Sequence, residues 1–139
     1  MCPEDPSSAP MAYFSHDSNS AMDIKCRRLL KAMGYEGYGR WWRVCELMAA
    51  ATGHSLPVSE EMDAEILADE LGFKGVGDLT GFLRRLCDFG LVSADALSGG
   101  RVESARMMRN AGYMGKRRAT AMANGRKGGR PPKRQGSSE

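Results

Sequence analysis

The 139-residue sequence contains neither a long apolar run nor a familiar catalytic motif. No stretch of about 18 apolar residues occurs, so no membrane span is predicted. The N-terminus lacks the apolar segment of a signal peptide, which favours a cytoplasmic protein. P-loop, HExxH and GxSxG signatures are missing, and the chain has only two histidines. We therefore expect a protein that is not an enzyme and holds no cofactor.

Closely spaced cysteines are missing as well. The four cysteines lie far apart and form no CxxC pair, whereas zinc sites and small disulfide frameworks use regular, close spacings. Three of them fall within apolar helical stripes. The pattern predicts buried thiols in a reducing compartment and no metal site, at Cys2, Cys26, Cys45 and Cys87.

The charge of the chain is divided unevenly along its length. Residues 1–100 carry nine Lys and Arg against 15 Asp and Glu, a net charge of −6. Residues 101–139 carry 11 Lys and Arg against two acids, a net charge of +9, so that the whole chain has +3. This asymmetry is typical of a basic appendage that meets a polyanion.

The strongest basic segment is residues 126–134, which holds five bases and no acid. Lys and Arg near phosphates release counterions, so such a run binds nucleic acid in a salt-dependent way. The sequence Gly129-Arg130-Pro131 resembles an AT-hook, although Gly128 stands where that motif usually has arginine. The alternative is a solubilising tail without a specific partner. The predicted DNA-binding residues here are Arg126, Lys127, Arg130, Lys133 and Arg134.

The periodicity of apolar residues predicts four helices before residue 90. Gly34 and Gly90 each follow such a stretch and are natural helix stops. The helices are expected over about 21–33, 37–52, 60–71 and 78–89. In the third, the residues expected to face inward are Met62, Ile66, Leu67 and Leu71.

Two short strands, 91–93 and 101–103, are predicted to form a hairpin through a turn that ends at Gly99 and Gly100. The chain is then divided into a disordered leader (1–11), a globular domain (12–104), a C-terminal helix (105–123) and a disordered basic tail (124–139). The order of elements is that of a winged helix, so we predict a mainly α winged-helix or helix-turn-helix domain with a short β-hairpin wing.

In a winged helix, the helix before the hairpin enters the major groove and the hairpin lies beside the backbone. The predicted contacts are therefore Thr80, Arg84 and Arg85 on the helix and Arg101 on the wing. Asp78 and Asp88 cancel the two helix arginines. The preceding helix carries six acids and no base, so it would repel DNA. An alternative hypothesis is an adaptor module, in which this acidic helix docks a protein partner and the tail is a tether.

Several other residues have two interpretations. His16 and Asp17 are adjacent and are interpreted as a local cap rather than an acid–base pair. His54 is expected at the surface or a strand edge. Trp41 and Trp42 are assigned to the core rather than to base stacking.

Further bases lie outside the tail. A basic face on the first helix could extend through Arg40 and Arg43 towards a phosphate-binding strip, or could simply be solvated. Arg106, Arg109, Lys116, Arg117 and Arg118 are expected to spread around more than one face of the last helix. The bases of the first-helix face are Lys25, Arg27, Arg28 and Lys31.

Three stretches together resemble a known family. They are Tyr13–Asn19 (YFSHDSN), Gly34–Trp42 (GYEGYGRWW) and Phe89–Val92 (FGLV). They are similar to the N-terminal domain of phage and prophage replisome-organiser proteins, which are related to DnaD-like primosome proteins. The resemblance implies a winged helix that binds double-stranded DNA in replication initiation and helps to recruit a helicase or its loader. It implies no catalysis, and it leaves self-association open.

Overall fold

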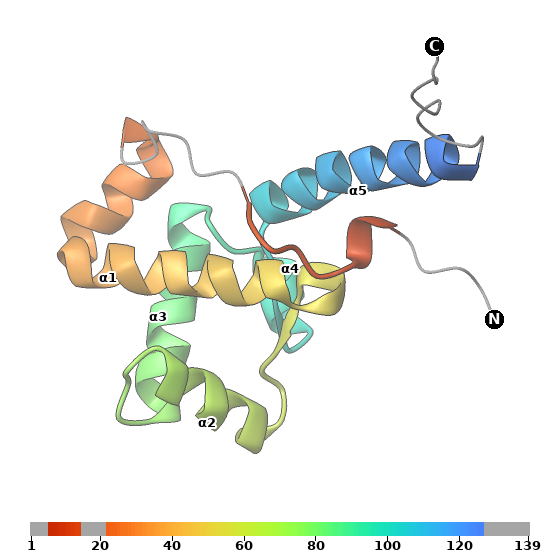
Figure 1. Cartoon of the computed structure of the whole chain (residues 1–139). Coiled ribbons are helices and arrows are strands. Elements are labelled where there is room, and N and C mark those ends of the chain that lie inside the picture. The colour runs from red at the N-terminus through yellow and green to blue at the C-terminus, as the bar shows by residue number, and fades with distance from the viewer. Residues whose placement is uncertain (1–5, 15–21, 127–139) are drawn as a thin grey trace, which may run out of the picture.

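The computed structural model describes residues 6–14 and 22–126. Over these residues the fold is mainly α with one small two-stranded antiparallel sheet, which confirms the predicted class at that level. The elements are η1 (Pro6–Ser8), α1 (Ile24–Ala50), η3 (Thr52–His54), β1 (Leu56–Pro57), α2 (Glu61–Glu70), α3 (Val76–Phe89), α4 (Ala94–Ser98), β2 (Arg101–Val102) and α5 (Ala105–Arg126) (Figure 1).

Helix α1 consists of two arms that meet at Gly34. The backbone there has φ 68° and ψ −166°, which is not helical and which favours glycine. Figure 1 shows the sharp bend between the two arms. The predicted break at Gly34 is confirmed, and Gly90 likewise ends α3 in a left-handed conformation.

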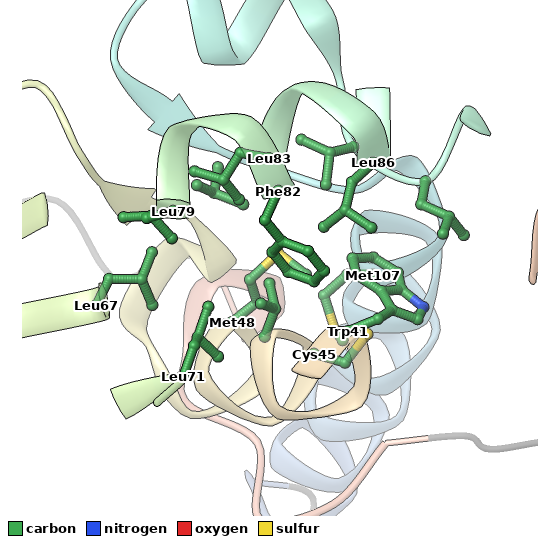
Figure 2. Close-up of a cluster of buried hydrophobic side chains, with 14 of the residues drawn as sticks. Trp41, Cys45, Met48, Leu67, Leu71, Leu79, Phe82, Leu83, Leu86 and Met107 are labelled. Carbon is green, nitrogen blue, oxygen red and sulfur yellow. The ribbon is translucent and has the colours of Figure 1, made fainter. Parts of the chain in front are cut away.

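The core is built where the second arm of α1 meets α2, α3 and the base of α5. Trp41 and Met48 are 2% and 0% exposed, and they pack towards the apolar face of α3. Figure 2 shows that α3 contributes most of its apolar side chains to this cluster. The labelled side chains of the cluster are Trp41, Cys45, Met48, Leu67, Leu71, Leu79, Phe82, Leu83, Leu86 and Met107.

The inward face of α2 differs from the prediction. Met62 and Ile66 are 72% and 58% exposed, whereas Ala64, Leu67 and Ala68 are buried. A helix that packs on one side buries only one stripe, and the small alanines let α2 approach its neighbours closely. Leu67 and Leu71 are buried as predicted, whereas Met62 and Ile66 are left on the opposite face.

The predicted hairpin is also wrong. Residues 94–98 form the short helix α4, because the Ser93 hydroxyl accepts a hydrogen bond from the Ala96 N–H at 3.2 Å and caps its N-terminus. β2 therefore pairs with β1 instead, in the register Leu56 to Val102 and Pro57 to Arg101. One backbone hydrogen bond, from Ser93 N to Glu103 O at 2.9 Å, joins the two segments that were expected to be paired strands.

The leader differs from the prediction over residues 6–11, and residues 1–5 lie outside the described residues. Met11 is 5% exposed, and its N–H donates to the Ala49 carbonyl oxygen at 2.8 Å. The segment runs alongside α5, and a Cβ at Gly115 would lie 2.7 Å from the Ser7 backbone (Figure 1). Because glycine allows this close approach, the leader is packed against the fold.

Helix α5 continues to Arg126, three residues beyond the predicted end. The remainder of the predicted tail, residues 127–139, lies outside the described residues. Among the described helices, none combines the length and the hydropathy that crossing a membrane requires.

Candidate nucleic-acid interface

Helix α5 presents one exposed basic face. Arg109, Tyr113, Lys116 and Arg117 follow helical spacing and are all exposed, so they lie along the same side of the helix. The Arg117 guanidinium lies 6.0 Å from the Tyr113 ring centre, and α5 contains no acidic residue. Guanidinium and ammonium groups donate hydrogen bonds to phosphate oxygens, so this α5 basic face (Arg109, Tyr113, Lys116, Arg117) suits a phosphate backbone.

The two remaining bases with described side chains on α5 turn towards the body. The Arg106 guanidinium lies 5.7 Å from the Trp42 ring centre. Arg118 donates to the carbonyl oxygens of Ala9 and Pro10, at 3.1 and 2.8 Å. The bases of α5 therefore lie on more than one face, as expected. One group faces outward, and the other holds the helix to the rest of the protein.

A buried histidine completes the attachment of the leader. His54 is 1% exposed, which contradicts the expected surface position. Its Nδ1 lies 3.0 Å from the Met48 carbonyl oxygen, and its Nε2 lies 2.8 Å from the Ser7 carbonyl oxygen. His54 therefore joins the C-terminal end of α1 to the segment that crosses α5 at Gly115.

The predicted residues on α3 are exposed, but the helix surface is electrically balanced. Thr80 donates its hydroxyl to the Val76 carbonyl oxygen at 3.0 Å, within its own helix. Arg84 is exposed, and the Arg85 guanidinium lies 5.2 Å from the Phe89 ring centre. Two exposed acids on the same helix, Asp78 and Asp88, cancel the two arginines.

Two grooves flank α3. The larger, about 820 Å³, separates α3 from α4 and Gly100, and Arg84 and Asp88 line it. The other, about 580 Å³, separates α3 from α1, and Arg85 and Gly81 line it. The two arginines of α3 thus border different grooves, with the outer ridge of α3 between them.

The predicted wing arginine is fixed to the body of the protein. Arg101 donates from Nε to the Ser55 hydroxyl and from Nη2 to the Ser55 carbonyl oxygen, the latter at 3.1 Å. The Ser55 hydroxyl in turn donates to Glu103 at 2.9 Å. Arg101 is exposed, but it stands on a two-residue strand rather than on a projecting hairpin.

The suggested phosphate-binding strip on α1 is not formed. Arg40 donates from Nε to the Leu71 carbonyl oxygen at 2.7 Å and covers the Phe73 ring at 4.4 Å. Arg43 pairs with Glu46 and Glu70, at 2.9 and 3.0 Å. Both arginines therefore join α1 to α2. The exposed bases of the first arm are Lys25, Arg27, Arg28 and Lys31.

Several predicted site residues lie at the end of the described part of the chain or outside it. Lys127, Arg130, Lys133 and Arg134 lie outside the described residues, and Arg126 is described as the last residue of α5 by its backbone alone. His16 and Asp17 also lie outside the described residues. The α5 basic face leads directly, in sequence, into this basic segment.

Of the three described thiols, two are buried as the sequence predicts. Cys26 and Cys45 are buried, and burial raises the pKa of both thiols. Cys87 is half-buried, and burial raises its pKa as well. Cys2 lies outside the described residues. Over residues 6–14 and 22–126, no group of three or more His, Cys, Asp or Glu side chains is arranged to hold a metal ion.

Comparison with known protein families matches most of the globular part of the chain. The model of a family described as Lin1244/Lin1753-like, N-terminal, matches residues 13–102, which is more than half of the chain. The matched range contains α1 to β2 and stops before α5. No curated protein and no solved structure matches the chain.

Proposed function

The chain belongs to the Lin1244/Lin1753-like N-terminal family, and on that premise we propose that it binds double-stranded DNA in the cytoplasm, without catalysis. The observation that carries the proposal is the α5 basic face. It is acid-free, exposed, and continued in sequence by five bases within residues 126–134. Phosphate contacts of this kind give affinity without strong sequence preference.

The body would orient the chain on the duplex. Helix α3 follows α2, is followed by the short helix α4 and then β2, and presents a ridge between two grooves. We assign α3 to the position of the recognition helix in a winged helix. In this proposal α4 and β2 stand where a winged helix has its hairpin. Thr80, Arg84 and Arg85 would lie nearest the base edges, with Arg101 beside the backbone.

The biological setting that we propose is the initiation or organisation of phage-type replication. It rests on the resemblance of Tyr13–Asn19, Gly34–Trp42 and Phe89–Val92 to replisome-organiser proteins. In the structure the second stretch forms the α1 bend and supplies the core residue Trp41, so it maintains the body rather than the interface. A replicative helicase or its loader is the expected protein partner.

A salt titration of the full chain on a short duplex, followed by fluorescence anisotropy, tests the proposal. About six phosphate contacts would weaken binding on the order of a thousandfold between low and moderate salt. A·T-rich and G·C-rich duplexes measured side by side test the AT-hook resemblance of Gly129–Pro131. An affinity that does not respond to salt contradicts the electrostatic mechanism.

A second candidate function is a protein-interaction adaptor. The observation that favours it is the exposure of Met62 and Ile66 on the acidic helix α2. Absence of DNA binding even at low salt would favour this candidate over the first.

A further inference from the structure

Helix α2 has an outward face that joins apolar and acidic side chains. Met62 and Ile66 are 72% and 58% exposed, and Glu65 and Asp69 are exposed beside them at helical spacing. We call these four residues the α2 outward face. Over residues 6–14 and 22–126, the only acid of α2 in an ion pair is Glu70, which pairs with Arg43.

This face is poorly matched to water alone. Isolated exposed apolar residues are ordinary, but Met62 and Ile66 are neighbours one turn apart on a short helix. They stand among acids of one sign, and like charges so close together repel one another. A basic surface with an apolar centre would satisfy both features of the α2 outward face.

The α5 basic face has that chemistry. Its centre is Tyr113, which is 61% exposed, and Arg109, Lys116 and Arg117 surround it. The lengths also agree. Helix α2 has ten residues, about 15 Å, and the α5 basic face from 109 to 117 has nine residues, about 13 Å.

The two faces cannot meet within one molecule. In Figure 1, α2 and α5 lie on opposite sides of the second arm of α1. We infer that the α2 outward face of one copy of this chain docks on the α5 basic face of a second copy. Such a contact is heterologous, because each copy offers two different surfaces. A single helix pair is smaller than a standard interface, so the association is reversible and weak. It does not depend on DNA binding.

Sedimentation velocity of the full chain over a range of micromolar concentrations measures this association. The sedimentation coefficient should rise with concentration at about 0.05 M salt and should stop rising at about 0.5 M. Met62→Ser/Ile66→Ser alters only exposed side chains of α2 and should weaken association at least tenfold. Lys116→Glu/Arg117→Glu should do the same from the other side. Arg27→Glu/Arg28→Glu makes the same charge change on the exposed first arm of α1 and should leave association unchanged.

Mixing the two defective variants is the most specific test of the proposed contact. The α2 variant retains its α5 basic face, and the α5 variant retains its α2 outward face. Equal amounts of the two should therefore form a dimer that neither forms alone, and the assembly should stop there because both free ends are defective.

Three results would overturn the inference: a wild-type chain that stays monomeric at low salt, variants that associate as the wild type does, or a mixture that remains monomeric. Duplex binding by Met62→Ser/Ile66→Ser is measured in parallel, at chain concentrations below those at which the wild type associates, and should equal that of the wild type. A variant that loses self-association but still binds DNA, or a wild-type chain that self-associates but does not bind DNA, therefore distinguishes this inference from the proposed function.

Discussion

Helices α3 and α5 differ in how far they are buried and in the charge that they could present to a polyanion. Helix α3 buries five side chains in the core, carries two bases and two acids, and lies between two grooves. Helix α5 carries six bases and no acid, and Met107 and Ala111 in its first half are buried. Helix α3 is held firmly in the core but has no net charge, whereas α5 is charged but attached at one end. The difference indicates that position and affinity come from separate parts of the chain.

The attachment of α5 is itself informative. Helix α3 is held by apolar packing, whereas α5 is held partly by the leader through His54, Gly115 and Arg118. A surface that supplies charge needs less precise placement than one that reads base edges. Five predictions test this division between the two helices.

The largest effect is expected from removing the charge of residues 126–134, at the end of α5 and beyond it. Replacing the five bases of the tail by alanine should lower affinity for a duplex about a hundredfold or more at low salt, because about five phosphate contacts are lost. The magnitude of the negative slope of log affinity against log salt should fall by about four to five. Anisotropy titrations at several salt concentrations measure the affinity and the slope. The variant combines Arg126→Ala, Lys127→Ala, Arg130→Ala, Lys133→Ala and Arg134→Ala. Unchanged affinity would show that residues 126–134 do not contribute to DNA binding.

The second prediction concerns the attachment of α5. His54→Phe removes the imidazole between the Met48 and Ser7 carbonyl oxygens, so at least one of them loses its hydrogen-bond donor, at a cost of about 1–3 kcal/mol of unfolding free energy. Thermal unfolding should show a Tm lower by several degrees. Amide hydrogen exchange should become faster along α5 and change little in α3.

Arg118→Ala provides the companion variant, since it releases the same leader from the side of α5. It should produce a smaller Tm decrease with the same pattern of exchange. Equal acceleration in α3 and α5 would show that the two helices unfold as one unit, contrary to the proposed separation.

The sequence predicted well the features that depend on neighbouring residues. The break at Gly34 and the end of α3 at Gly90 follow from the conformational freedom of glycine. The burial of Cys26 and Cys45 follows from their place in apolar helical stripes. Helix limits can therefore be obtained from glycine positions, and part of the core from apolar periodicity.

The features that were missed depend on contacts distant in sequence. The exposure of Met62 follows from α2 packing through its alanines, and the burial of His54 follows from the crossing of the leader. The pairing of β2 with β1 joins residues more than 40 positions apart, and residues 94–98 form the helix α4 in place of the predicted turn. Within the candidate site, the prediction found bases but could not tell that Arg118 faces inward and Lys116 outward.

The third prediction concerns Cys45, which lies beside Met107 at the base of α5. Burial raises the pKa of its thiol, so the folded protein keeps the proton at a pH where the unfolded chain loses it. This contribution to stability is fully present below about pH 8.5 and is lost above it, by about 1.4 kcal/mol per pH unit. Urea unfolding between pH 7 and pH 10 measures the loss. Cys45→Ala should show a shallower dependence, and an identical dependence would contradict the assignment.

A smaller effect is expected on α3. Arg84→Ala/Arg85→Ala should weaken binding to a random duplex only about two- to fivefold, because Asp78 and Asp88 already offset these charges. If α3 reads base edges, the variant should also reduce any difference in affinity between A·T-rich and G·C-rich duplexes. Competition titrations with the two duplexes measure this. A loss as large as that from the tail variant would reverse the roles of the two regions.

The most direct test of the account compares two pairs of exposed bases in otherwise identical full-length chains. Lys116→Ala/Arg117→Ala removes two charges from the α5 basic face, and Arg27→Ala/Arg28→Ala removes two from the first arm of α1. The magnitude of the negative slope of log affinity against log salt should fall by about two for the α5 pair. It should stay at the wild-type value for the α1 pair. Equal slopes for the two variants, or a fall only for the α1 pair, would contradict the claim that DNA affinity lies along α5.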